Sequence, residues 1–396
     1  MCNFVPGEVV AIAPLGPLND LGRDLPGDLS VSPLVTEIGD LPSESPFIGL
    51  GVAVLRTDPG IELLGLSQMS ARLSAEIMKG TALVDLNHIV PLSAEPPATD
   101  SLRLSSHSER LVISLRALLR GALGSSQGRL AMLDSGLAPS FISHRKVTYL
   151  DYTAGGRLQL NAPRVDPLGH GTRVAKILDE VLPVGVDLVV GRLPSAPSEI
   201  TCLHLAHAVG DLVARTSPDV LNLSVAPRDD TFRCRNCGQH ASIPAFLPTF
   251  FSLMVRLAGT STSSTVTVMA AGNSGQVPNS RWLADDLSSL LIAVAENRRG
   301  ERARYSSAPQ GPFADLFSAS VFGGDDPDEP GAIGAFADGT HGTSFAAPFL
   351  AAATLLAKRL RRPHLDGQPS GLGQVVQDLI RRAERGHRLH LRPAEE

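Results

Sequence analysis

Short apolar runs alternate with longer amphipathic segments over most of the chain beyond about residue 128. Five runs lack strict alternation of apolar and polar positions, as strands buried on both faces do. They are Arg129–Leu133, Asp187–Val190, Val220–Leu223, Thr265–Ala270 and Leu290–Ala295. Helical spacing is present over Thr172–Leu182, Glu199–Arg215, Ala245–Leu257 and Phe345–Leu356. This alternation predicts an α/β fold whose mostly parallel sheet is covered by helices on both faces.

The first part of the chain follows a different pattern, because proline and glycine interrupt its first sixty positions. Three elements are then predicted, a strand, a helix and a second strand, over Ile61–Leu66, Ser67–Lys79 and Thr81–Val90. A polar linker over residues 93–108 and a helix over Glu109–Leu123 follow. We therefore expect three parts: a smaller N-terminal α+β module over residues 1–120, a main domain over 121–365 and a helical tail over 366–396.

Composition narrows the class of protein. Hydrophobic residues make up 43% of the chain and charged residues 19%, which is typical of globular proteins. The formal charge of −5 comes without a run of basic residues, so we expect no nucleic-acid partner. The sequence has no stretch of about 18 uninterrupted apolar residues, so we expect no membrane-spanning helix.

The N-terminus and the cysteines indicate where the protein works. The start of the chain lacks basic residues, and Pro14 and Pro17 break its first apolar stretch, unlike a secretory signal. Four cysteines are too few for a disulfide scaffold and are typical of a reducing compartment. The sequence therefore predicts a cytoplasmic location.

Two candidate catalytic side chains flank the first part of the predicted sheet. Asp134 ends the apolar run before Ser135-Gly136, where the carboxyl end of a strand faces the usual cleft, although a turn or capping aspartate is the commoner reading of such a motif alone. His170 stands between two glycines at the start of a helical segment. An imidazole can accept and return a proton because its ordinary pKa is about 6.5.

The strongest chemical signal is the run Gly339-Thr340-His341-Gly342-Thr343-Ser344-Phe345-Ala346-Ala347-Pro348. It places Ser344 at a helix N-terminus, where unpaired backbone N–H groups favour negative charge developing on a substrate oxygen. Asn273 lies in a Gly-Asn-Ser-Gly turn directly after a buried strand. Its amide can donate a hydrogen bond to the same oxygen, or it can serve the turn alone.

Four motifs resemble those of the subtilisin family and occur in that family's order: Asp-Ser-Gly, His-Gly-Thr-x-Val-Ala, Ala-Ala-Gly-Asn and Gly-Thr-Ser-x-Ala-x-Pro. The resemblance covers about residues 127–360. It implies a three-layer fold and a serine endopeptidase that cleaves polypeptide substrates without a cofactor. It also implies roles for Ser344 as nucleophile, His170 as general base, Asp134 as its orienting carboxylate and Asn273 as oxyanion donor.

The resemblance further implies which residues line the substrate: Asn222, Leu223, Ser224, Val225, Ala271 and Gly272. The chain departs from the family in two places. Val225-Ala226-Pro227 replaces the usual glycine-rich stretch, and Ser318-Ala319-Ser320 only loosely matches an Ala-Pro-Gly turn before the nucleophile.

Two alternative functions stay open. One is a peptide-processing or acyl-transfer enzyme with the same triad, and the other is a pseudoprotease scaffold. The N-terminal module would be a propeptide, or a regulatory domain that binds a partner protein.

Two further clusters contain side chains that can ligate metals. Cys234, Cys237 and His240 could ligate zinc with Cys2, Cys202, His204 or His207, but free thiols on a surface loop are the favoured reading, so no metal is expected. The acidic run Asp325, Asp326, Asp328 and Glu329 is expected to be a solvated loop.

Overall fold

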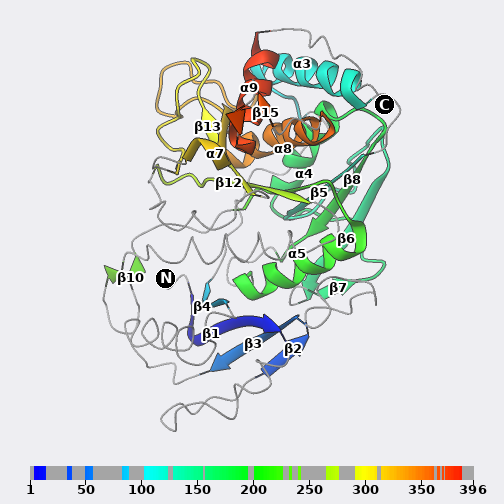
Figure 1. Ribbon diagram of the computed structural model, residues 1–396, viewed down its shortest axis with the longest axis vertical. Coiled ribbons are helices and arrows are strands. Elements are labelled where there is room, and N and C mark those ends of the chain that lie inside the picture. The colour runs from blue at the N-terminus through cyan, green and yellow to red at the C-terminus, as the bar shows by residue number, and fades with distance from the viewer. Residues whose placement is uncertain are drawn as a thin grey trace.

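The computed structural model describes residues 4–14, 34–37, 50–56, 83–88, 102–123, 128–154, 157–194, 200–225, 232–233, 240–241, 265–275, 290–309, 314–360, 364–365, 368–369 and 371–385. These residues form two main sheets, which Figure 1 shows in separate parts of the molecule. The larger sheet belongs to the region beyond residue 128, and the smaller one to the first ninety residues.

The larger sheet has eight strands in the order β14-β13-β12-β9-β5-β8-β6-β7. Their bounds are Gly128–Asp134 (β5), Val147–Ala154 (β6), Arg157–Gln159 (β7), Val186–Arg192 (β8), Val220–Leu223 (β9), Val266–Ala270 (β12), Leu290–Glu296 (β13) and Ser318–Phe322 (β14). All neighbouring pairs are parallel except β6 with β7. The prediction of a mostly parallel α/β sheet is thus confirmed.

Helices cover both faces of this sheet and make the three layers visible in Figure 1. Ser106–Leu123 (α3), His170–Val181 (α4), Thr343–Arg359 (α8) and Leu372–Glu384 (α9) lie on one side, and Cys202–Thr216 (α5) lies on the other. Ala314–Phe317 (α7) is a short helix before β14. Helix α8 is the centre of its layer, because it is buried from Thr343 to Ala357.

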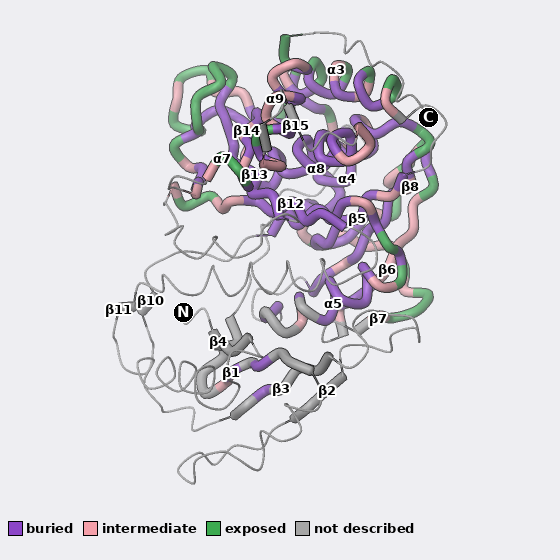
Figure 2. Tube along the Cα trace, viewed as in Figure 1, coloured by how far each residue is buried: buried purple, intermediate pink, exposed green. Residues whose placement is uncertain are grey.

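The core joins α8 to the sheet and to three further helices (Figure 2). Helix α3 contributes Leu111, Leu115 and Leu119 to this core, so a helix from the range predicted for the N-terminal module packs directly on α8. Helix α9, from the range predicted as a tail, packs against α8 and β14. The domain boundaries themselves stay predictions.

The smaller sheet is antiparallel, with the order β2-β3-β1-β4. Its strands are Phe4–Pro14 (β1), Leu34–Glu37 (β2), Leu50–Arg56 (β3) and Leu83–His88 (β4). Only β4 matches a predicted strand. The sequence pattern missed β1 because Pro6 and Gly7 interrupt it, at the point where its register with β4 shifts.

Four short strands complete the described elements: Phe232–Arg233 (β10) with His240–Ala241 (β11), and His364–Leu365 (β15) with Gln368–Pro369 (β16). The predicted elements over Ile61–Leu66, Ser67–Lys79 and Ala245–Leu257 lie outside the described residues.

Candidate active site

Asp134 and His170 meet at the carboxyl edge of the sheet. Asp134 is the last residue of β5, His170 is the first residue of α4, and His170 Nδ1 lies 2.7 Å from Asp134 Oδ1. The two side chains are 0% and 1% exposed. Beside an ionised carboxylate the proton belongs on Nδ1, which makes Nε2 the basic nitrogen of the neutral ring.

Glycine allows these two segments to approach so closely. A Cβ at Gly171 would stand 2.3 Å from the carbonyl oxygen of Gly136. No residue larger than glycine fits there without moving backbone, which is why the histidine is followed by glycine. The close packing places the start of α4 directly against the turn that follows Asp134.

Asp166 also joins these segments, and sequence reasoning missed it. Its Oδ2 accepts hydrogen bonds from the Thr172 backbone N–H at 2.7 Å and from the Thr172 hydroxyl, and its Oδ1 accepts one from the Ser135 hydroxyl at 2.7 Å. Ser135 Oγ in turn accepts a bond from Gly171 N at 2.8 Å. One carboxylate therefore fixes the turn after Asp134 to the first turn of α4. The only available signal was an aspartate four positions before His170.

Ser344 is the second residue of α8 and is bonded to the end of β9. Its hydroxyl donates to the carbonyl oxygen of Ser224 at 3.0 Å, and the Ser224 hydroxyl donates to the carbonyl oxygen of Ser344 at 2.8 Å. Pro348, four residues further on, has no N–H to complete the helical bond to Ser344. The Ser224 hydroxyl therefore supplies the bond that the proline removes.

The helix that begins with His170 packs against the helix that carries Ser344. The ring of Phe345, the residue after Ser344, lies 5.4 Å from the His170 ring between centroids. Ser344 is bonded to the residue after β9, the parallel neighbour of β5, so Asp134, His170 and Ser344 lie at the same edge of the sheet.

The amide of Asn273 is held in one orientation by Thr343. Both the backbone N–H and the hydroxyl of Thr343 donate to Asn273 Oδ1, each at 2.9 Å. The amide oxygen is therefore the group turned toward Thr343, and Nδ2 is available as a donor on the other side. A Cβ at Gly342 would lie 3.1 Å from Nδ2, so glycine there keeps space beside the amide nitrogen.

The turn that carries Asn273 is supported by the segment after β13. Gly275 N donates to the Tyr305 carbonyl at 2.7 Å, and Ser307 N donates to the Gly272 carbonyl at 2.9 Å. These two backbone bonds enclose the turn on both sides of Asn273, whose side chain remains on the surface. The arrangement holds an exposed amide on a fixed backbone.

The residues predicted to line the substrate are only partly on the surface. Asn222 and Leu223 are fully buried within β9, and Asn222 Nδ2 donates to Ser224 Oγ at 2.9 Å. Ser224 and Val225 are buried beyond the end of the strand, whereas Ala271 and Gly272 are half-buried. Their roles toward substrate stay predictions.

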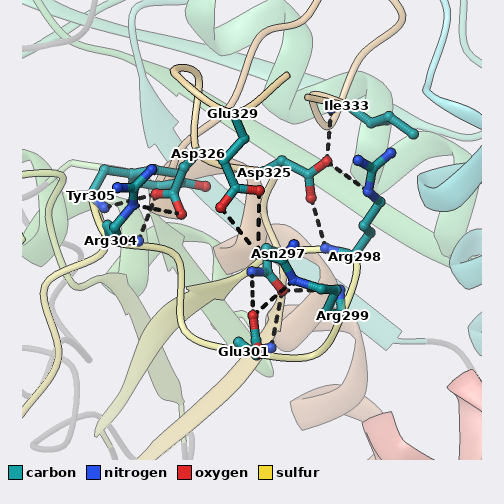
Figure 3. Close-up of polar contacts among 10 residues, drawn as sticks. All are labelled: Asn297, Arg298, Arg299, Glu301, Arg304, Tyr305, Asp325, Asp326, Glu329 and Ile333. Carbon is teal, nitrogen blue, oxygen red and sulfur yellow. Dashed lines mark hydrogen bonds and ion pairs between the residues drawn. The ribbon is translucent and has the colours of Figure 1, made fainter. Parts of the chain in front are cut away.

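The structure decides two points about the loops. Ser318-Ala319-Ser320, which only loosely matches the family's turn, belongs to the sheet-edge strand β14. The expectation of a solvated acidic loop is wrong for two of its residues. Asp325 and Asp326 are not solvated: they are 2% and 4% exposed, and each accepts backbone N–H groups (Figure 3). Arg298 and Arg304 pair with them, so these two carboxylates anchor the surrounding loops.

Within the described residues no group of three or more His, Cys, Asp or Glu side chains could hold a metal ion. Cys234 and Cys237, weighed above as zinc ligands, lie outside those residues. Across the part of the chain that the structure describes, no helix is long and apolar enough to cross a membrane.

The comparisons with known proteins find similarity to this chain among solved structures. No family model and no curated protein matches it. An epidermin leader peptide processing serine protease (EpiP) from Staphylococcus aureus superposes with a TM-score of 0.51 at 12% identity, covering 93% of this chain and 98% of that one.

A cold adapted subtilisin-like serine proteinase (TM-score 0.41, 19% identity, 64% and 81% covered) and MycP1 from the ESX-1 type VII secretion system (0.44, 18%, 72% and 82%) also match. Taken with the sheet order and the helices on both faces, the similarity to EpiP shows that the chain has the fold of subtilisin-like serine proteases.

Proposed function

We propose that this protein is a serine endopeptidase that cleaves polypeptides through an acyl-enzyme on Ser344. The observation that carries the proposal is the buried Asp134–His170 bond at the same sheet edge as a serine at a helix N-terminus. A protease needs a nucleophile, a base and a group that orients the base, and these three side chains have the required types and order along the chain.

In this mechanism His170 removes the hydroxyl proton of Ser344 while the oxygen attacks the substrate carbonyl. The hydroxyl must first turn from the Ser224 carbonyl, its acceptor in the structure, toward the imidazole. Asp134 stabilises the imidazolium that forms, and His170 then protonates the leaving amine. Water repeats the sequence and releases the acyl group from Ser344.

The developing oxyanion would be bound by two donors, the Asn273 amide nitrogen and the Ser344 backbone N–H. Two Thr343 bonds to Asn273 Oδ1 support this assignment, because they turn the nitrogen away from Thr343. A donor that is already oriented needs no rearrangement when charge develops, and this is the source of its catalytic effect.

The same site serves a second candidate function, the processing of one particular peptide or the transfer of its acyl group to an amine. The similarity to EpiP, a leader peptide processing protease, favours it because the alignment covers 93% of this chain. Only the products separate hydrolysis from transfer.

We also propose that the N-terminal module restrains the protease, alone or with a partner protein. Strand β4 of the smaller sheet contacts helix α5 of the main domain, so the module is in contact with the domain that it would regulate. Cytoplasmic location likewise remains a proposal.

The test is incubation of the full chain with a mixture of unfolded proteins and synthetic peptides, followed by mass spectrometry of new termini. We expect new free carboxyl termini that are missing with Ser344→Ala. Products joined to an added amine would favour the transfer enzyme, and identical product spectra for both proteins would refute peptidase activity.

A further inference from the structure

Arg173 is a buried cation one helical turn from His170. It lies on α4 and is 2% exposed, although an arginine is rarely buried unless it is paired. The His-Gly-Thr-x-Val-Ala motif leaves this position open, so the resemblance assigns it no role.

The guanidinium of Arg173 contacts the loop that leads to the nucleophile. We call residues 333–342 the nucleophile loop, since α8 and Ser344 follow it directly. Arg173 Nη1 lies 2.7 Å from Asp338 Oδ2, and the guanidinium carbon stands 5.3 Å from the centre of the Phe336 ring. One side chain thus holds the loop by an ion pair and by a cation–π contact.

Phe336 continues this contact back to the active site. Its ring meets the Phe345 ring edge-on, with centroids 5.4 Å apart, and Phe345 in turn contacts His170. Consecutive contacts therefore run from Arg173 through Phe336 and Phe345 to His170. Arg173 and His170 are themselves neighbours along one face of α4. These contacts connect the helix of the base with the helix of the nucleophile through side chains outside the triad.

The carboxylate of Asp338 is held in one orientation by hydrogen bonds within the nucleophile loop. Its Oδ1 accepts hydrogen bonds from the backbone N–H of Thr340 at 3.1 Å and from the Thr340 hydroxyl at 2.6 Å, which leaves Oδ2 for Arg173. The loop is closed by the bond from Ala335 N to the Thr340 carbonyl at 2.7 Å. Gly342 N then donates to the Gly323 carbonyl at 2.9 Å, just before α8 begins.

We propose that Arg173 is a positioning residue that, through Asp338 and Phe336, fixes the nucleophile loop and thereby the place of Ser344 relative to the imidazole of His170. The proposal rests on the proposed function of that site. A displacement of about 1 Å at a reacting group costs roughly 100-fold in rate, so a clamp on the loop has a measurable effect on acylation.

The experiment compares Arg173→Met, which keeps an unbranched side chain over Phe336, Asp338→Asn, which keeps the shape of the carboxylate, and their double variant. Arg173→Lys retains the charge. The matched control is Arg299→Met, which removes an arginine from the exposed pair with Glu301. For each full-length protein we would measure the maximal rate of labelling by a fluorophosphonate, the probe concentration at half that rate, and hydrogen exchange of the backbone amides over residues 335–343.

We expect Arg173→Met and Asp338→Asn each to lower the maximal labelling rate per folded molecule about 10- to 100-fold. The half-saturating probe concentration should stay within about twofold, because the clamp does not touch the probe. Exchange over residues 335–343 should become faster, Arg173→Lys should recover part of the rate, and the double variant should be no slower than the slower single variant.

Rates and exchange equal to those of Arg299→Met would overturn the proposal. A loss of rate explained entirely by a smaller folded fraction would overturn it as well. A wild-type protein that does not label at Ser344 would count against the proposed function itself, and the exchange measurement would still decide whether Arg173 holds the loop.

Discussion

The side-chain amide oxygen Oδ1 of Asn273 accepts two hydrogen bonds from Thr343, and this pair of bonds decides which end of the amide can face a substrate. The assignment of the amide nitrogen as an oxyanion donor follows from them. This assignment can be tested, because the donor Asn273 and the orienting residue Thr343 can be substituted separately.

We predict that Asn273→Ala lowers the rate of acylation of Ser344 about 100- to 1000-fold, the loss seen when an oxyanion donor is removed from a serine protease. Thr343→Val removes one orienting bond and also the hydrogen bond that Thr343 Oγ1 accepts from Gly272 N, and it should have a smaller effect than Asn273→Ala. In the Asn273→Ala background its effect should be smaller still, since the orienting bond has then already lost its acceptor. Single-turnover acylation rates test this; Ser274→Ala, on the exposed part of the same turn, is the control. Additive losses would contradict the account.

Ser224 matters for a different reason, because its hydroxyl completes the hydrogen bonding of the Ser344 carbonyl in place of the absent N–H of Pro348. We predict that Ser224→Ala lowers the stability of the fold by roughly 1–3 kcal/mol, the cost of a buried carbonyl without its donor. Denaturant unfolding measures this difference. A change no larger than that of Ser274→Ala would mean that the bond contributes little.

Helix α3 is packed against the sheet partly through His107, whose ring centroid lies 4.2 Å from that of Phe322 in β14. Burial lowers the pKa of His107 below its ordinary value of 6.5, and Arg110 lowers it further. Asp325 acts in the opposite direction and Arg298 in the same one. The neutral ring is therefore the form that the fold favours.

A histidine with a lowered pKa contributes stability that is present above pH 6.5 and is lost as the pH falls through the folded-state pKa. We predict that the melting temperature falls between about pH 8 and pH 5, and that His107→Gln removes on the order of 1 °C of this fall. Scanning calorimetry across this range tests the sign. An equal fall in both proteins would show that the pKa of His107 is the same in the folded and unfolded states.

The buried strands could be predicted because their residues are apolar on both faces, as in Leu290–Ala295. Strand β6 could not, because polar Thr148 and Asp151 interrupt it and its pairing with β8 is a tertiary property. The paired Asp134 and His170 were accessible through their motifs. Asp166 and Arg173 were not, because their roles depend on contacts with Ser135 and with Asp338 that no local pattern records.

The position of α3 decides where the chain can be cut to remove the N-terminal sheet. Leu111, Leu115 and Leu119 of this helix lie in the main core, and a buried leucine side chain contributes about 1.5–3 kcal/mol. We predict that a chain beginning at Leu102 folds, whereas one beginning at Gly124 does not. Near- and far-ultraviolet circular dichroism and thermal melts compare the two, and a cooperative melt of the shorter chain would refute the assignment of α3 to the core.

The same truncation removes residues 1–101, the part of the N-terminal module that precedes α3, and tests whether this part restrains the enzyme. We predict that the chain beginning at Leu102 acylates faster than the full chain, because β4 and its sheet no longer rest on α5. Equal acylation rates would show that the module has another role, such as binding a partner protein.

Peptidase activity requires an assembled active site, and labelling by a fluorophosphonate detects one. The intact protein would be treated beside Ser344→Ala and His170→Ala, and the modified peptide mapped by mass spectrometry. We predict one labelled residue, Ser344, and no labelling in either variant. Labelling elsewhere, or none in the full chain and in the chain beginning at Leu102, would contradict the assignment of a serine peptidase.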